Sequence, residues 1–225
     1  MSGHGIKFNL NSKLHLKDPQ MTEYGQKLIS HSILLFDELG FEKFTFKKLS
    51  KKIESTETSI YRYFKNKHKL LLWLTCWYWE WVYYLIDINI KNIEDPKKRL
   101  QITIHNIVNA SSESPLTTYI NENILHKVVI NESSKAYHVY NVDDENQHGS
   151  FESYVHVVNK VAEIIKLYKH DYPYTKVLAS NLFEMPNSQI FFAEHLPALT
   201  DIKDGLHKYD ELETVLCNMT FKLLS

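Results

Sequence analysis

Cysteine, glycine and proline are all scarce in this sequence. Only two of its 225 residues are cysteine, Cys76 and Cys217, and glycine and proline number six each. Two isolated cysteines provide neither a disulfide framework nor the paired ligands of a structural zinc site. No pair of the twelve histidines has i, i+4 ligand spacing with an acidic partner nearby. Few glycines and prolines also argue against a collagenous or turn-rich all-β chain. We therefore expect no metal and no cofactor.

The sequence also lacks a long uninterrupted hydrophobic run. A membrane-spanning helix needs about 18 to 20 consecutive apolar residues. The most apolar stretch, residues 70–90, is interrupted by Glu80 and Asp87, and is typical of a buried helix in a soluble protein. The N-terminus has charged and polar residues where a signal peptide would have an apolar centre. We expect a cytoplasmic protein that does not bind membranes.

Charge is nearly balanced overall but is unevenly distributed. Residues 1–72 contain 13 Lys and Arg against 7 Asp and Glu, a net charge of +6, whereas residues 73–225 contain 13 against 20, a net charge of −7. A positive N-terminal part on a negative remainder is typical of a chain with one DNA-binding end. Chance fluctuation in charge is the alternative.

Hydrophobic spacing predicts an all-α protein. The helical period begins at Met21 and recurs to the C-terminus, and no strong strand alternation follows the first twenty residues. We expect an N-terminal arm (1–20), a helix-turn-helix domain of three helices (21–68) and a larger helical domain for ligand binding and dimerisation (69–225). Residues 141–150 are predicted to form a loop, and Pro186 to kink or break a helix. The arm is compatible with lying along DNA, bracing a dimer or being disordered.

Three short helices are predicted between Met21 and Phe64, with Gly40 as the cap that ends the first. In the second, Phe46, Leu49 and Ile53 share one face, and four lysines occupy the other. Thr56 is a suitable N-cap for the third helix. A basic second helix followed by a tight turn predicts a helix-turn-helix, whose last helix enters the major groove of DNA.

The run from Gly40 to Leu71, GFEKFTFKKLSKKIESTETSIYRYFKNKHKLL, resembles the DNA-binding domain of the TetR family without a gap. The resemblance covers residues 22–72, and its matching positions are Gly40-Phe41, Thr45-Phe46, Leu49-Ser50, Ile60-Tyr61, Phe64, Lys67 and Leu70. The family usually has glycine in the turn, where this chain has Glu54-Ser55. A left-handed residue there would be strained.

The resemblance implies a set of DNA contacts. Thr45, Tyr61 and Lys67 would contact phosphates, and Thr56 would cap the recognition helix and touch the backbone. The residues facing the groove would be Glu57, Thr58, Ser59, Arg62 and Tyr63. Arg62 can pair with guanine, and Glu57 can accept from cytosine. The alternatives are that Tyr61 packs in the core and that Glu57 only complements the helix dipole.

The resemblance also implies a helical body that forms a homodimer and holds a small-molecule pocket. Residues placed in an apolar or aromatic pocket are Trp77, Trp81, Tyr84, His126, Phe192 and His195. The alternative is that the tryptophan stripe is core packing, as aromatic stripes at helical spacing usually are. For dimerisation we expect the apolar stripe of residues 151–168 and the helix or helices of residues 174–195.

These features predict a sequence-specific transcriptional regulator, a repressor, that binds a near-palindromic operator in double-stranded DNA as a homodimer and is released by a small apolar or aromatic effector. One alternative is a DNA-binding protein whose body binds a protein partner. Another is an all-α enzyme, although the sequence contains no phosphate loop, nucleophile elbow or catalytic cysteine context. We expect no catalytic activity.

Overall fold

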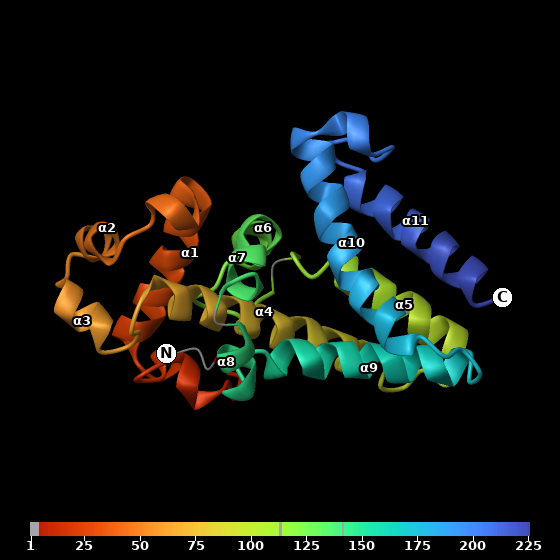
Figure 1. The fold of residues 1–225 in the computed structure, drawn as a ribbon, viewed down its shortest axis with the longest axis horizontal. Coiled ribbons are helices and arrows are strands. Elements are labelled where there is room, and N and C mark those ends of the chain that lie inside the picture. Colours follow the sequence, from red (N-terminus) through yellow and green to blue (C-terminus); the bar gives the residue numbers. More distant parts are fainter. Residues whose placement is uncertain (1–4, 113, 141) are drawn as a thin grey trace. The chain divides into compact units, whose positions relative to one another are not determined.

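The protein is all-α, as its sequence predicts. The computed structural model describes residues 5–112, 114–140 and 142–225, and these form eleven α-helices and three short 3-10 turns without a β-strand (Figure 1). None of the described helices combines the length and apolarity that crossing a bilayer requires. The observed helices agree with the all-α fold class that the helical periodicity and the family resemblance predict.

The helices have the following bounds: α1 Glu23–Lys43, α2 Phe46–Lys52, α3 Glu57–Tyr61, α4 Lys67–Ile90, α5 Pro96–Val108, α6 Glu122–Glu132, α7 Ser134–Tyr137, α8 Val142–Gln147, α9 Glu152–Tyr168, α10 Thr175–His195 and α11 Lys208–Leu223. Many begin at a capping side chain that accepts a hydrogen bond from the first turn. These N-caps are Thr22, Thr45, Thr56, Asp95 and Asn121.

The chain divides into two compact units. The first contains the described residues up to Glu80 together with Ser111–Ser153, and the second contains Trp81–Ala110 and Tyr154–Ser225. This division falls within α4 and assigns α6, α7 and α8 to the same unit as the N-terminal helices. The predicted domains 21–68 and 69–225 are defined by function rather than by packing, and they stay a prediction.

The core of the first unit is formed around the first half of α4. Trp73 and Trp77 are fully buried, and the ring of Phe64 meets Trp73 edge-on with centroids 6.2 Å apart. Two other aromatic side chains of α4, Tyr78 and Trp79, are buried with their polar groups paired. The Tyr78 hydroxyl lies 2.7 Å from Nδ1 of His126, and Nε1 of Trp79 donates to the Tyr137 hydroxyl at 2.8 Å. Pairing these groups removes the cost of burying them.

In the second unit, α5, α10 and α11 pack against one another (Figure 1). Its buried side chains include Leu100 and Ile104 of α5, Leu182 of α10 and Leu216 of α11. Pro186 is buried inside α10, and this helix continues from Thr175 to His195. Of the predicted kink or break at Pro186, the break is therefore wrong, and the packing of α10 against α5 and α11 supports the turn that lacks one backbone hydrogen bond.

The turn between α2 and α3 has the geometry of a helix C-cap with a left-handed residue. The N–H of Ser55 donates to the carbonyl of Ser50 at 2.8 Å, and the N–H of Glu54 donates to that of Lys51 at 3.3 Å. These two bonds form a Schellman motif, whose left-handed position is normally glycine. Glu54 occupies that position with φ of +56°. The departure from the family pattern therefore leaves the geometry unchanged and places a strained residue in the turn.

Residues 142–147 form helix α8, so the predicted loop at residues 141–150 is wrong over this range; Asn141 lies outside the described residues. The prediction equated polarity with exposure. The carboxylate of Glu145 is buried because it pairs with Lys69 at 2.5 Å and accepts from Ser150 at 2.5 Å. Burial alone would raise the pKa of Glu145, but the hydrogen bonds from Lys69 and Ser150 outweigh it and hold that pKa below its usual value.

The described part of the N-terminal arm, residues 5–20, packs on the first unit. Leu10 and Leu14 are buried, and the ring of Phe8 meets Trp77 edge-on at 5.3 Å. The side-chain amide of Asn11 donates to the carbonyls of His148 and Gly149 at 2.9 and 3.0 Å. The arm is therefore an ordered part of this unit. Residues 1–4 of the predicted arm lie outside the described residues.

We predict that Glu54→Gly stabilises the protein. Relief of left-handed strain contributes about 1–2 kcal/mol, and the greater freedom of glycine in the unfolded chain offsets roughly 0.5–1 kcal/mol of it. The net gain in the free energy of unfolding is about 0.5–1 kcal/mol, measured by urea denaturation with tryptophan fluorescence. Glu54→Ala is the matched control because it removes the same side chain and keeps the strain. Equal stability of the two variants would contradict the assignment of strain.

Candidate nucleic-acid interface

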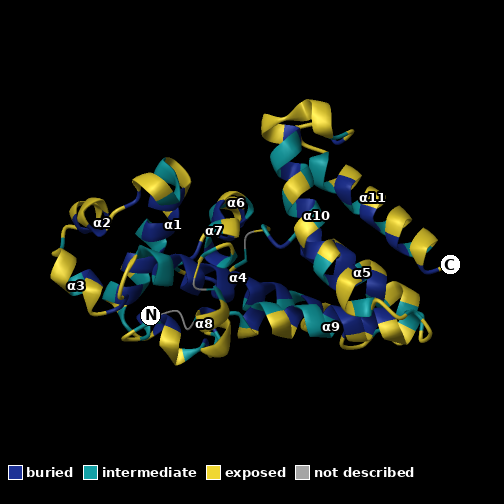
Figure 2. Cartoon of the chain, viewed as in Figure 1, coloured by how far each residue is buried: buried dark blue, intermediate teal, exposed yellow. Residues whose placement is uncertain are grey.

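Helix α3 presents a polar, exposed surface at the end of the helix-turn-helix. Figure 2 shows mostly exposed positions along α3. Glu57, Thr58 and Arg62 are exposed, and Ser59 is partly exposed. Ile60 is fully buried and attaches the helix to the core. One face of this short helix therefore anchors it, and the other carries hydrogen-bonding groups of the kind that read base edges.

Tyr61 is held at the edge of this surface. Its ring is 48% exposed and meets Phe46 of α2 edge-on, with centroids 5.0 Å apart. The contact orients the phenol while leaving nearly half of it accessible. Tyr61 is thus neither a core residue nor a loosely held surface residue, and its position agrees with the one that the resemblance implies.

Thr45 and Thr56 both cap helices of this domain. Thr45 Oγ1 accepts from the N–H of Lys48 at 3.2 Å, and Thr56 Oγ1 accepts from that of Ser59 at 3.2 Å. Each side chain is exposed. The Thr45 hydroxyl proton lies outside its capping bond, so it can be donated to a phosphate oxygen. The Thr56 hydroxyl is also 3.0 Å from that of Ser59.

Lys67, at the start of α4, is partly exposed and is also hydrogen-bonded to the backbone of α1. Its ammonium donates to the carbonyls of Phe41 and Glu42 at 2.7 and 3.2 Å, and it lies 4.4 Å from the centroid of the Phe41 ring. These carbonyls belong to the last turn of α1, where a cation is favourable. An ammonium has three donors, so one remains after these two bonds.

Tyr63 does not share the exposed surface of α3, in contrast to the expectation that it faces the groove. Its side chain is only 5% exposed, and its hydroxyl lies 2.8 Å from that of Thr22, the N-cap of α1. The ring also contacts Tyr24, with centroids 5.6 Å apart. Burial between α1 and the end of α3 therefore corrects this expectation.

Helix α2 adds a basic surface beside α3. The side chains of Lys47, Lys48, Lys51 and Lys52 are all exposed. Lys48 donates to the carbonyl of Lys43 at 2.9 Å, and Lys52 lies 3.9 Å from Glu38. Exposed ion pairs of this kind contribute little to stability. The surface concentrates positive charge where a DNA backbone would pass if α3 entered the groove.

The end of α1 is fixed by α6 as well as by Lys67. Glu132, at the end of α6, accepts from the N–H of Phe41 at 3.1 Å and pairs with Lys135 at 2.5 Å. Gly40 ends the regular part of α1 with φ of +69°, as the sequence predicts, and a Cβ there would lie 3.0 Å from the Glu132 carboxylate. The backbone N–H and the backbone carbonyl of Phe41 are thus both hydrogen-bonded. The contact of Glu132 was not predicted, because nothing in the spacing of this residue in the sequence indicates it.

The residues predicted to line a ligand pocket are divided between the two compact units. Trp77 and His126 belong to the first unit, and the other four, Trp81, Tyr84, Phe192 and His195, belong to the second. Trp77, Trp81 and His126 are buried, whereas His195 is exposed. The rings of Trp81 and Tyr84 stack with centroids 5.7 Å apart. None of the six lines a cavity described below, and their ligand role stays a prediction.

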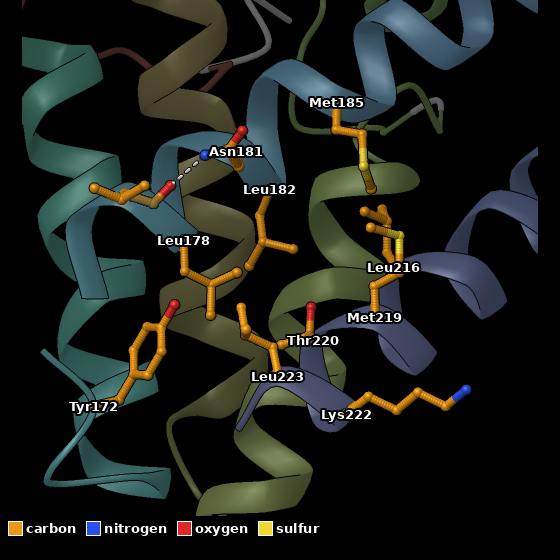
Figure 3. Close-up of a pocket in the computed structure, with 11 residues that line it drawn as sticks. Tyr172, Leu178, Asn181, Leu182, Met185, Leu216, Met219, Thr220, Lys222 and Leu223 are labelled. Atoms are coloured by element: carbon orange, nitrogen blue, oxygen red, sulfur yellow. Dashed lines mark hydrogen bonds between the residues drawn. The ribbon is translucent and has the colours of Figure 1, made fainter. Parts of the chain in front are cut away.

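A groove of about 550 Å³ lies between α10 and α11 in the second unit (Figure 3). Its lining is mostly apolar and consists of Tyr172, Val177, Leu178, Asn181, Leu182, Met185, Leu216, Met219, Thr220, Lys222 and Leu223. Several of these side chains are unusually exposed for their type, at 58% for Val177, 53% for Met219 and 54% for Leu223. A smaller polar cavity of about 320 Å³ lies in the first unit, around the N-terminus of α6.

Comparisons with known proteins agree with this description. Residues 28–74 match the model of a family described as bacterial regulatory proteins of the tetR family. No curated protein sequence matches the chain. Among solved structures, the chain is similar to AibR in complex with isovaleryl coenzyme A and operator DNA, at 11% identity and a TM-score of 0.60, covering 86% of this chain and 97% of that one.

Two further structures have the same similarity in fold. One is PfmR, a TetR family transcriptional regulator from Thermus thermophilus, at 12% identity and a TM-score of 0.60, covering 87% and 97% of the two chains. The other is the superantigen PfiT, at 15% identity and a TM-score of 0.60, covering 90% and 97%. Identities this low establish the fold only. Residues 28–74 are a TetR-family DNA-binding domain, carried by a chain that has the fold of TetR-family transcriptional regulators.

Proposed function

We propose that the protein is a sequence-specific transcriptional repressor that binds a near-palindromic operator as a homodimer. The observation that carries the proposal is the exposed polar face of α3, which is anchored by Ile60 and flanked by the lysines of α2. Arg62 and Glu57 would read bases, and Tyr61, Thr45 and Lys67 would hold phosphates. Thr56, Thr58 and Ser59 complete the proposed surface, and the buried Tyr63 is left out of it.

The homodimer would form through α10 and α11. Their shared groove carries exposed valine, methionine and leucine side chains, which a second copy of the same surface would bury around a two-fold axis. This changes part of the interface expected from the sequence. Val161, Ala162 and Ile165 of the α9 stripe are already buried within the chain, so they are not available to a partner. The contribution of α11 was not foreseen.

Release by a small apolar effector is part of the proposal and rests on analogy. The similar structure of AibR contains isovaleryl coenzyme A together with operator DNA. The alternative, a body that binds a protein partner, has one parallel in the similar fold of the superantigen PfiT. Loss of operator binding in the presence of an acyl coenzyme A ester would favour the first, since a protein-binding body would leave DNA affinity unchanged.

The direct test is selection of the purified full-length protein on a random duplex library at physiological salt, followed by sequencing. We expect a near-palindromic motif whose half-sites lie about one helical turn, roughly 34–36 Å, or slightly more apart. Such a motif would require two recognition helices related by symmetry. Absence of any enriched sequence would contradict sequence-specific binding.

On the selected operator, Arg62→Lys should relax sequence choice at one position of each half-site. Lysine keeps the charge but loses the bidentate fork, so discrimination there should fall by about 1–3 kcal/mol. Tyr61→Phe should instead weaken operator and scrambled duplexes equally, because it removes a phosphate contact and keeps the ring on Phe46. Fluorescence anisotropy measures both. Equal, sequence-independent losses from the two variants would contradict the assignment of Arg62 as a base reader.

Replacing Met219 and Leu223 together with aspartate should convert the dimer into a monomer. Two buried carboxylates facing their symmetry mates would be neither solvated nor paired. Analytical ultracentrifugation should show half the mass, and circular dichroism should show unchanged helix content. Leu206→Asp is the control, since Leu206 is 97% exposed and does not line the groove. A double variant that remains dimeric would place the interface elsewhere.

A further inference from the structure

We propose that the N-terminal arm extends the DNA-binding surface, with Lys17 as a phosphate contact beside the end of the recognition helix. This inference rests on the proposed function and adds a residue outside the family motif. The sequence alone leaves the role of the arm open, and the contacts of its described part favour a role in DNA binding.

The arm is attached to the end of the recognition helix by its backbone. The N–H of Leu16 donates to the carbonyl of Tyr63 at 2.7 Å, one residue beyond Arg62. On the other side of Lys17, Asp18 accepts from the N–H of Gln20 at 2.9 Å and caps a short 3-10 turn, Pro19–Met21. Leu16 and Asp18, the residues on either side of Lys17, are therefore both fixed by hydrogen bonds.

The rest of the arm is anchored more deeply. Leu14 is 1% exposed, and the buried side-chain amide of Gln20 forms two hydrogen bonds with the backbone of Phe8, at 3.0 and 2.8 Å. Asn11 is bonded to the turn between α8 and α9. These contacts fix the path of the arm backbone, so the backbone at Lys17 is already in one defined position before DNA binds.

The exposed Lys17 lies over Tyr63, the residue that was expected to face the groove and is instead buried. The ammonium is 5.3 Å from the centroid of the Tyr63 ring, whose side chain is buried. The resemblance implies that position 63 faces DNA, and here the outward position above that ring is occupied by a cation. Tyr63 supports the charge from beneath, as an aromatic face does for a lysine.

A phosphate is the DNA group that fits this position. Lysine provides a point charge with three donors, which suits phosphate oxygens better than a base edge. The only carboxylate adjacent in sequence, that of Asp18, is engaged as the cap of the 3-10 turn. The contact would add affinity without adding sequence preference.

The test is the salt dependence of DNA binding, measured by fluorescence anisotropy on a random-sequence duplex and on the selected operator. Each phosphate neutralised contributes about 0.9 to the slope of log K against log salt concentration. Lys17→Gln should therefore make the salt dependence weaker. The magnitude of the slope should fall by about 0.9 for each DNA-bound domain, or about 1.8 for a dimer, on both duplexes alike. Lys17→Arg should restore the wild-type slope.

Lys91→Gln is the matched control, because Lys91 is also exposed and lies directly after α4 in the second unit. It should leave the slope unchanged. A Lys17→Gln variant that behaves like this control would overturn the role of Lys17 and leave the proposed function intact. Wild-type protein that shows no salt-dependent binding to either duplex would overturn the proposed function itself, and the inference with it.

Discussion

The backbone of Phe41 is the constraint on which the geometry of the DNA-binding domain depends. Its N–H is accepted by Glu132 from α6, and its carbonyl accepts from Lys67 at the start of α4. Gly40 makes this possible because its left-handed conformation turns the chain out of α1 at that point. The backbone of a single residue is therefore bonded to two other helices of the same compact unit, and the end of α1, from which the chain continues to α2 and α3, is fixed.

The arm and the turn before α3 extend this constraint to the reading surface. Leu16 bonds to the backbone just after α3, and the Schellman motif around Glu54 sets the direction in which α3 begins. Such a short helix has little stability of its own, so its orientation comes from these neighbours. The consequence for function is preorganisation: a surface held in place before DNA arrives loses less conformational freedom on binding.

Much of the helix-turn-helix could be predicted from the sequence because its information is local. Gly40 and Thr56 act as caps, as predicted, and Phe46 and Leu49 are buried as their spacing predicts. These features depend on neighbours within a few residues, and the family resemblance adds positions to them.

The remaining features depend on contacts between residues far apart in the chain. Glu145 is buried because of Lys69, and Tyr63 because of Thr22, so neither could be placed from its own neighbourhood. Apolar spacing predicted the stripe of α9 as a dimer surface, although Val161, Ala162 and Ile165 of that stripe are buried within the chain itself. The groove between α10 and α11 follows from how two helices pack, which no pattern within either helix specifies.

The central claim is that DNA binds at α3, the start of α2 and the arm around Lys17. Hydrogen exchange of the full-length protein, followed by mass spectrometry with and without a short duplex, tests it most directly. The account predicts slower exchange on DNA binding in peptides covering residues 16–22 and 45–67, and little change in α9. Protection confined to the second unit, or no protection under conditions where the duplex is bound, would contradict it.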